Sequence, residues 1–174
     1  MELFLELLKF TIPALIVFFT AYFLLKMLLD ERQRIDRMAL KQDAQKITLP
    51  LRLQAYERLT LLCDRVSIHN SLLRIRMPGM TVADLKGALL LSISQEFEHN
   101  TSQQLFVSET LWRIINLAKS QTLDLITEAA EDLDPQANAG LLVDKLLAAV
   151  DAQDAMPPLQ RAIVAIRTEA GQLF

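Results

Sequence analysis

The sequence has little cysteine, glycine, proline and histidine. Its 174 residues include one cysteine, four glycines, six prolines and two histidines. A single cysteine, Cys63, excludes an intramolecular disulfide and fits a reducing compartment. So few glycines and prolines argue against a β-rich or disordered chain. The composition therefore favours a mostly helical protein.

Familiar enzyme motifs are also missing from the sequence. It has no glycine-rich phosphate loop, no Ser/His/Asp arrangement and no Cys/His metal spacing. Cys63 lies in an apolar helical pattern, which predicts a core residue rather than a reactive or ligating one. We therefore expect neither an enzyme nor a cofactor.

Charge is spread unevenly along the chain. Residues 26–119 carry a net charge of +4 and residues 120–174 carry −6, within a total of −3. Net acidity together with few aromatic residues argues against a nucleic-acid partner.

The main feature that is present is an apolar run from Leu3 to Leu29. Its uncharged part, residues 10–25, spans about 24 Å at a helical rise of ~1.5 Å per residue. The flanking leucines extend it toward the roughly 30 Å of a bilayer core. We predict that residues 1–29 form a retained transmembrane helix. The residues expected to anchor it are Phe10, Ile12, Pro13, Leu15, Phe18, Phe19, Tyr22 and Leu25.

Three other interpretations of this run are less favourable. A cleavable signal peptide is disfavoured because Glu2 and Glu6 replace basic residues and no small-residue cleavage site follows. A buried core helix is disfavoured by the low charge over so long a stretch. A helix lying in the membrane interface would need a polar face, which residues 12–19 do not have.

The residues beyond the run predict its orientation. Lys26, Arg32, Arg34, Arg37 and Lys41 follow it, whereas Lys9 and the terminal amine lie on its other side. Because Lys and Arg resist translocation, we expect the N-terminus outside and the remainder in the cytoplasm. Residues 30–47 are half charged and predict a solvated helical stalk.

From residue 48 onward the pattern is that of amphipathic helices, and we predict an all-α fold of about five helices packed as an antiparallel bundle over residues 48–174. Expected helix starts are Thr48 with Pro50, the capping box of Thr81 with Asp84, Ser108, Asp134 with Pro135, and Pro157 with Pro158. The first helix is expected over about residues 50–68, after which residues 70–80, with Pro78 and Gly79, are expected to turn the chain. The helix that begins after Thr81 is expected to have an apolar face formed by Val82, Leu85, Leu89, Ile93 and Phe97.

One polar constellation, "QEFEHN", is a candidate site. Glu96 and His99 lie three residues apart, as in the Glu-x-x-His pairs of di-iron bundles, which need two such pairs. His69 belongs to no second pair, so a polar helix end is the preferred interpretation. Glu57, Arg58 and Arg65 could bind this corner as ion pairs, but a solvated helix face is the preferred interpretation of these residues. The residues proposed for interaction or for the corner are Glu96, Glu98, His99, Asn100, Gln103 and Gln104.

The stretch from "TLPLRLQAYERL" to "EFEHNTSQQLFVSE", about residues 46–130, resembles a domain-of-unknown-function family of bacterial single-pass membrane proteins. The resemblance implies an N-terminal anchor in the bacterial inner membrane, a helical cytoplasmic region and no known activity. We therefore expect an interaction or scaffold protein whose partners are the lipid bilayer and either another protein or a second copy. An accessory subunit of a larger membrane complex and a metal protein using Glu96 and His99 are the alternatives.

Overall fold

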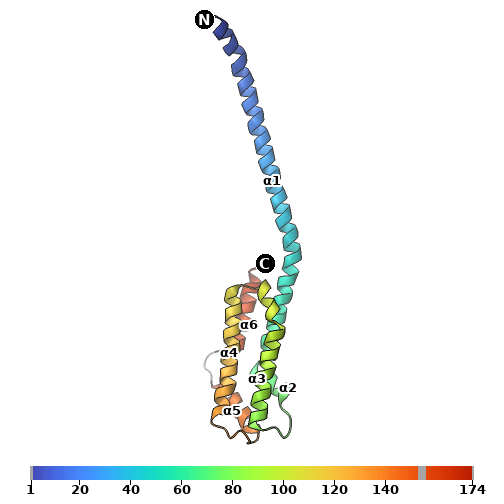
Figure 1. Ribbon diagram of the computed structural model, residues 1–174, viewed down its shortest axis with the longest axis vertical. Coiled ribbons are helices and arrows are strands. Elements are labelled where there is room, and N and C mark those ends of the chain that lie inside the picture. The colour runs from blue at the N-terminus through green and yellow to red at the C-terminus, as the bar shows by residue number, and fades with distance from the viewer. Residues whose placement is uncertain (1, 153–155, 174) are drawn as a thin grey trace. The chain divides into compact units, whose positions relative to one another are not determined.

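The computed structural model describes residues 2–152 and 156–173, with the side chains of residues 2–10, 14 and 40–44 outside the description. Its elements, in chain order, are α1 (Glu2–Arg65), α2 (Ile68–Ile75), α3 (Val82–His99), the 3-10 helix η1 (Thr101–Phe106), α4 (Glu109–Glu131), α5 (Gly140–Asp151) and α6 (Pro158–Gly171) (Figure 1). The predicted all-α class is confirmed, because the described residues form helices and only one isolated β-bridge.

Contacts between residues divide the chain into two units, residues 1–48 and 49–174. The first unit consists of helix α1 up to Thr48. Within it, Thr11–Ala39 is long and apolar enough to cross a membrane, by length and composition. All of its described side chains are exposed, including Ile12, Pro13, Leu15, Phe18, Phe19, Tyr22 and Leu25. The side chain of Phe10 lies outside the described set.

The expected helix start at Thr48 and Pro50 is wrong, because α1 continues without interruption from Glu2 to Arg65. A proline inside a helix removes one backbone hydrogen bond and costs about 3 kcal/mol. Good helix formers on both sides, and burial of later residues of α1 such as Ala55 and Leu59, offset that cost.

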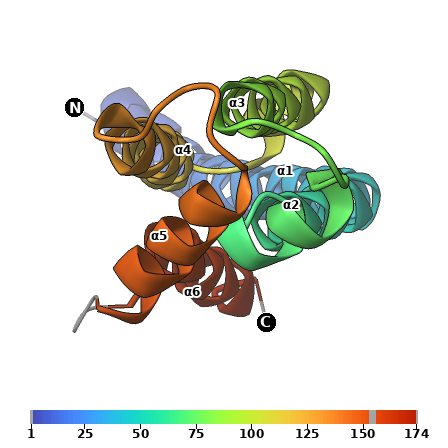
Figure 2. The same ribbon diagram turned by 90° about the horizontal axis from the view of Figure 1, so that it is seen from below.

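The second unit is built around one hydrophobic core. The end of α1 contributes Tyr56, Leu59 and Cys63, and Val66 follows directly after it. The predicted apolar face of α3 is confirmed. That face consists of Val82, Leu85, Leu89, Ile93 and Phe97, all buried. Helix α4 packs against α3, α5 and α6, and α2 packs against α3 and α5. Figure 2 shows α3 and α4 nearly end-on.

Local sequence signals set most of the helix starts. Thr81 and Asp84 form the predicted capping box, and the Ser108 hydroxyl caps α4 by accepting from the Leu111 backbone N–H at 3.1 Å. Pro158 occupies the first turn of α6, as expected. The predicted turn at Pro78 and Gly79 is also present, and Gly79 adopts a φ of 85°, which glycine tolerates without strain.

Two further expectations differ from the structure. The chain does not simply turn after residue 68. It forms α2, which begins after Ser67, whose hydroxyl accepts from the Asn70 backbone N–H at 3.4 Å.

Asp134 and Pro135 do not begin a helix, because α5 starts only at Gly140. The intervening residues hydrogen-bond instead to the start of α3. Val82 N–H donates to the Ala137 carbonyl at 2.9 Å, and Ala83 N–H donates to the Pro135 carbonyl at 3.0 Å. Contacts between distant segments therefore replace the helix that the local pattern predicted.

Candidate functional site

The polar corner predicted at the end of α3 is held by ion pairs. Glu96 Oε1 lies 3.0 Å from Arg65 Nη2 and 3.4 Å from Arg74 Nη1. The side chain of Glu96 is only 20% exposed, so these pairs partly compensate its removal from water. Of the three possible partners, Arg65 is therefore paired with Glu96, whereas Glu57 and Arg58 are exposed on α1. Arg74 was not anticipated, because it lies on the unpredicted α2.

The rest of the corner is made of local hydrogen bonds. His99 is exposed, and its Nδ1 lies 2.8 Å from the Gln95 carbonyl oxygen. The Asn100 amide donates to the Glu96 carbonyl at 2.9 Å. Gln103 is buried, whereas Glu98 and Gln104 are exposed. Asn100 and Gln103 therefore support the fold, and Glu98, His99 and Gln104 form its outward surface.

This geometry does not favour the metal interpretation. Glu96 is already engaged by two arginines. Within the described part of the chain, no three His, Cys, Asp or Glu side chains come together in a group that can hold a metal ion. A Glu-x-x-His pair requires further carboxylates from neighbouring helices.

A second polar cluster, which sequence reasoning did not find, is centred on Glu169. Its Oε1 accepts from the Ser108 backbone N–H at 2.8 Å and from the Tyr56 hydroxyl at 3.0 Å. The Ser108 hydroxyl donates to Oε2. Arg52 donates to the Tyr56 hydroxyl at 2.8 Å and to the Phe106 carbonyl at 3.1 Å. The cluster thus joins α1, the start of α4 and the end of α6.

Hydrogen bonding outweighs desolvation at Glu169. Burial alone raises its pKa, but the bonds from Ser108 and Tyr56 and the charge of Arg52 leave the pKa of the carboxyl below its ordinary value. The pKa of Tyr56 is raised, first by burial and then by its bond to the same carboxylate. The Glu169 carboxylate therefore has a structural role: it lies at the N-terminal end of α4, where the helix dipole favours a negative charge.

Only part of this cluster had a signal in the sequence. Ser108 was recognisable as a cap, but Arg52 and Glu169 are 117 positions apart and share no motif. Their pairing follows from the way the helices pack.

The chain belongs to the Family of unknown function (DUF7935), whose model matches residues 2–173. The match therefore includes the apolar helix as well as the helical second unit. No curated protein and no solved structure matches the chain significantly.

Proposed function

We propose that this protein is a membrane-anchored interaction or scaffold protein. The observation that supports this most strongly is the exposed apolar helix Thr11–Ala39. At about 1.5 Å per residue, its 29 residues are longer than a bilayer core of roughly 30 Å. The same helix continues to Arg65, and its last residues are part of the core of the second unit.

The proposed orientation places the second unit in the cytoplasm of a bacterial cell, at the inner membrane. Lys26, Arg32, Arg34 and Arg37 follow the apolar run and favour the cytoplasmic side. Fusing alkaline phosphatase to the C-terminus in one strain and a green fluorescent protein in another tests this. We expect fluorescence without phosphatase activity, and phosphatase activity would reverse the orientation.

The outward side of the corner is the proposed surface for a protein partner. Glu98, His99 and Gln104 are exposed there, and the neighbouring Leu105 is 79% exposed. An exposed large apolar side chain beside polar groups suits the edge of a protein interface. A second copy of this chain and a different membrane protein are both candidates.

Photocrosslinking of the full-length chain in native membranes tests the scaffold function. A photoreactive amino acid at Leu105 is compared with one at Leu141, which is 52% exposed on α5. We expect a specific crosslinked band, identified by mass spectrometry, from position 105 and not from position 141. Monomer alone from both positions, together with monomer alone after mild detergent extraction, would contradict the proposal.

A narrower version of this function is an accessory subunit of a larger membrane complex. Small residues such as Thr11 and Ala21 allow a neighbouring membrane helix to approach closely. Native electrophoresis of mildly solubilised membranes distinguishes the two versions. A discrete high-mass band containing other membrane-spanning proteins supports the subunit, and a homo-oligomer supports a self-associating scaffold.

A further inference from the structure

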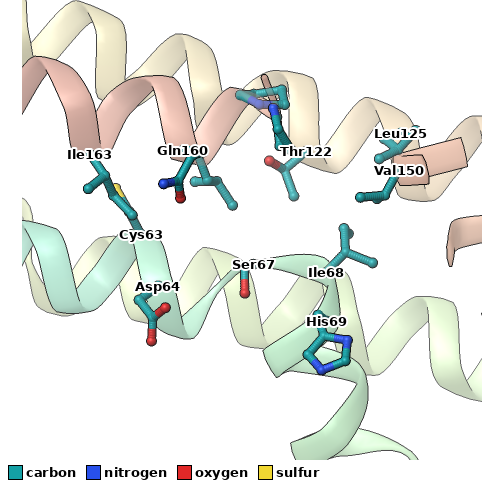
Figure 3. Close-up of a pocket in the computed structure, with 13 residues that line it drawn as sticks. Cys63, Asp64, Ser67, Ile68, His69, Thr122, Leu125, Val150, Gln160 and Ile163 are labelled. Carbon is teal, nitrogen blue, oxygen red and sulfur yellow. The ribbon is translucent and has the colours of Figure 1, made fainter. Parts of the chain in front are cut away.

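We propose that the second unit contains a binding site for a small, mostly apolar molecule with one neutral or cationic hydrogen-bonding group. The site is a cavity of about 350 Å³ lined by residues of α1, α2, α4, α5 and α6 (Figure 3). This volume falls within the range of pockets that hold small ligands, about 300–1,000 Å³. The inference goes beyond the scaffold function, which requires no small ligand.

The cavity arises from small side chains at core-facing positions. On α1, Leu59 and Leu62 fill the core, but the next residue toward the cavity is Cys63, and Ser67 follows at the start of α2. Across the cavity, α4 contributes Thr122 where a larger aliphatic residue would fill the space. Because part of its lining is exposed, the cavity opens to solvent on one side.

The inner wall of the cavity is apolar in character. Its buried members are Cys63, Ile68, Thr122, Leu159 and Ile163. The Thr122 hydroxyl already donates to the Ala118 carbonyl at 2.8 Å. Burial raises the pKa of the Cys63 thiol to about 12, so the wall also carries no thiolate. A ligand with an apolar body therefore suits the interior of the cavity.

The rim of the cavity is polar. The exposed lining residues are Asp64, His69, Pro157 and Gln160. Within the described part of the chain, neither the Asp64 carboxylate nor the Gln160 amide has a hydrogen-bonding or ionic partner. Gln160 projects from α6 into the space (Figure 3). An amide can bond a hydroxyl or an amine, while the carboxylate repels an anion. The rim thus selects a neutral or cationic group.

A matched set of probes tests this selection: phenylbutanol, phenylbutylamine and phenylbutyrate share an apolar body and differ in the charge of the polar end. Each is titrated into the full-length protein in lipid nanodiscs, with isotope-labelled isoleucine methyl groups observed by NMR. Ile68 and Ile163 report on the cavity, and Ile93 and Ile115 report on the core elsewhere. Ile12 and Ile16, on the apolar helix, report on partitioning of the probe into lipid.

We expect saturable shifts of Ile68 and Ile163 with the alcohol and the amine, and an affinity for the amine about threefold higher than for the carboxylate. Asp64→Asn should remove the difference between amine and carboxylate while the alcohol still binds. Shifts confined to Ile12 and Ile16, or equal shifts at Ile93 and Ile115, would overturn the proposal.

Filling the cavity supplies the matched control. Val150→Phe places a larger side chain in the cavity and should weaken phenylbutanol binding at least about tenfold. Val164→Phe makes the same change at an exposed position of α6 and should leave binding unchanged. If circular dichroism shows that Val150→Phe is unfolded, Gln160→Trp at the exposed rim replaces it. Undiminished binding by the folded filled variant would also overturn the proposal.

Discussion

The charge of Glu169 links three segments of the second unit. Its carboxylate is the common acceptor for Ser108 and Tyr56, and its side chain is 16% exposed. Glu169→Ala removes the acceptor of both donors, of which Tyr56 is buried and Ser108 is exposed, so we expect a loss of about 1 kcal/mol, at the low end of the roughly 1–3 kcal/mol for a buried donor left unpaired. Urea unfolding of the full-length chain in detergent, followed by the fluorescence of Trp112, should show this loss. Glu57→Gln, at an exposed position of α1, should change stability little. Equal stability of Glu169→Ala and the wild type would show that the cluster is only a surface contact.

The same carboxyl predicts how stability depends on pH. Its pKa in the folded chain is below the ordinary value, so the unfolded chain binds more protons at this group as the pH falls. The stabilisation is therefore complete above the ordinary glutamate pKa of about 4.3 and is lost as the pH falls through the lower folded value. We expect Glu169→Gln to lose less stability on acidification than the wild type. Parallel pH profiles for the two proteins would contradict this assignment.

The Cys63 thiol is expected to be unreactive in the folded chain. It is fully buried, and desolvation raises its pKa to about 12. Because the thiolate is the reactive form, alkylation by iodoacetamide should become fast only when denaturant opens the core. Mass spectrometry of the intact protein measures the labelled fraction. Rapid labelling without denaturant would show that the thiol reaches solvent in the native state.

At the scale of the helices, the capping box of α3 offers a clean test of local sequence signals. The Thr81 hydroxyl accepts from the Asp84 backbone N–H at 3.2 Å, and Asp84 accepts from the Thr81 N–H at 3.0 Å. Thr81→Ala should lower the free energy of unfolding by about 1 kcal/mol. The control is Thr127→Ala, at an exposed position inside α4, where alanine is the better helix former. A neutral Thr81→Ala would mean that the bonds to residues 135–139 alone position the start of α3.

Helix α3 also contains a matched pair of leucines on opposite sides. Leu89 is fully buried, and Leu91 is 60% exposed. Leu89→Ala should cost about 2–5 kcal/mol through lost burial and a residual cavity. Leu91→Ala removes the same atoms from an exposed position, so its effect on thermal unfolding should be much smaller. Similar losses would show that Leu91 is covered in the assembled protein, which would mark an interface.

These elements also show what the sequence can and cannot predict. The apolar face of α3 and the caps at Thr81 and Ser108 are local patterns, and they were predicted correctly. The start of α5 was not predicted correctly, because the carbonyls of Pro135 and Ala137 accept hydrogen bonds from the first residues of α3. The same limit applies to the candidate site. The polar corner could be predicted because its residues are contiguous in the sequence. The Glu169 cluster and the cavity could not, because they depend on helices far apart in the chain.

On the scale of the whole molecule, a single helix belongs to both units of the chain. Helix α1 contains the apolar segment Thr11–Ala39, and its last residues supply part of the core of the second unit. The family model matches both parts of the chain. The retained anchor proposed above requires such a continuous helix.

Placing charge in the apolar segment tests retention directly. Leu15 and Phe19 lie four residues apart on one face of α1, and arginine at the centre of a membrane helix costs about 2.5–3.5 kcal/mol for each substitution. The double variant Leu15→Arg, Phe19→Arg should leave the membrane fraction, as measured by alkaline carbonate extraction. The control, Ile35→Arg with Met38→Arg, adds the same charge to the already charged part of the helix and should remain embedded.

If the first variant stays in the membrane while the control is released, the spanning segment has been placed in the wrong part of α1. If wild type itself is extracted as a dispersed protein, the chain is not anchored by this helix, and the orientation proposed from its basic flank no longer applies.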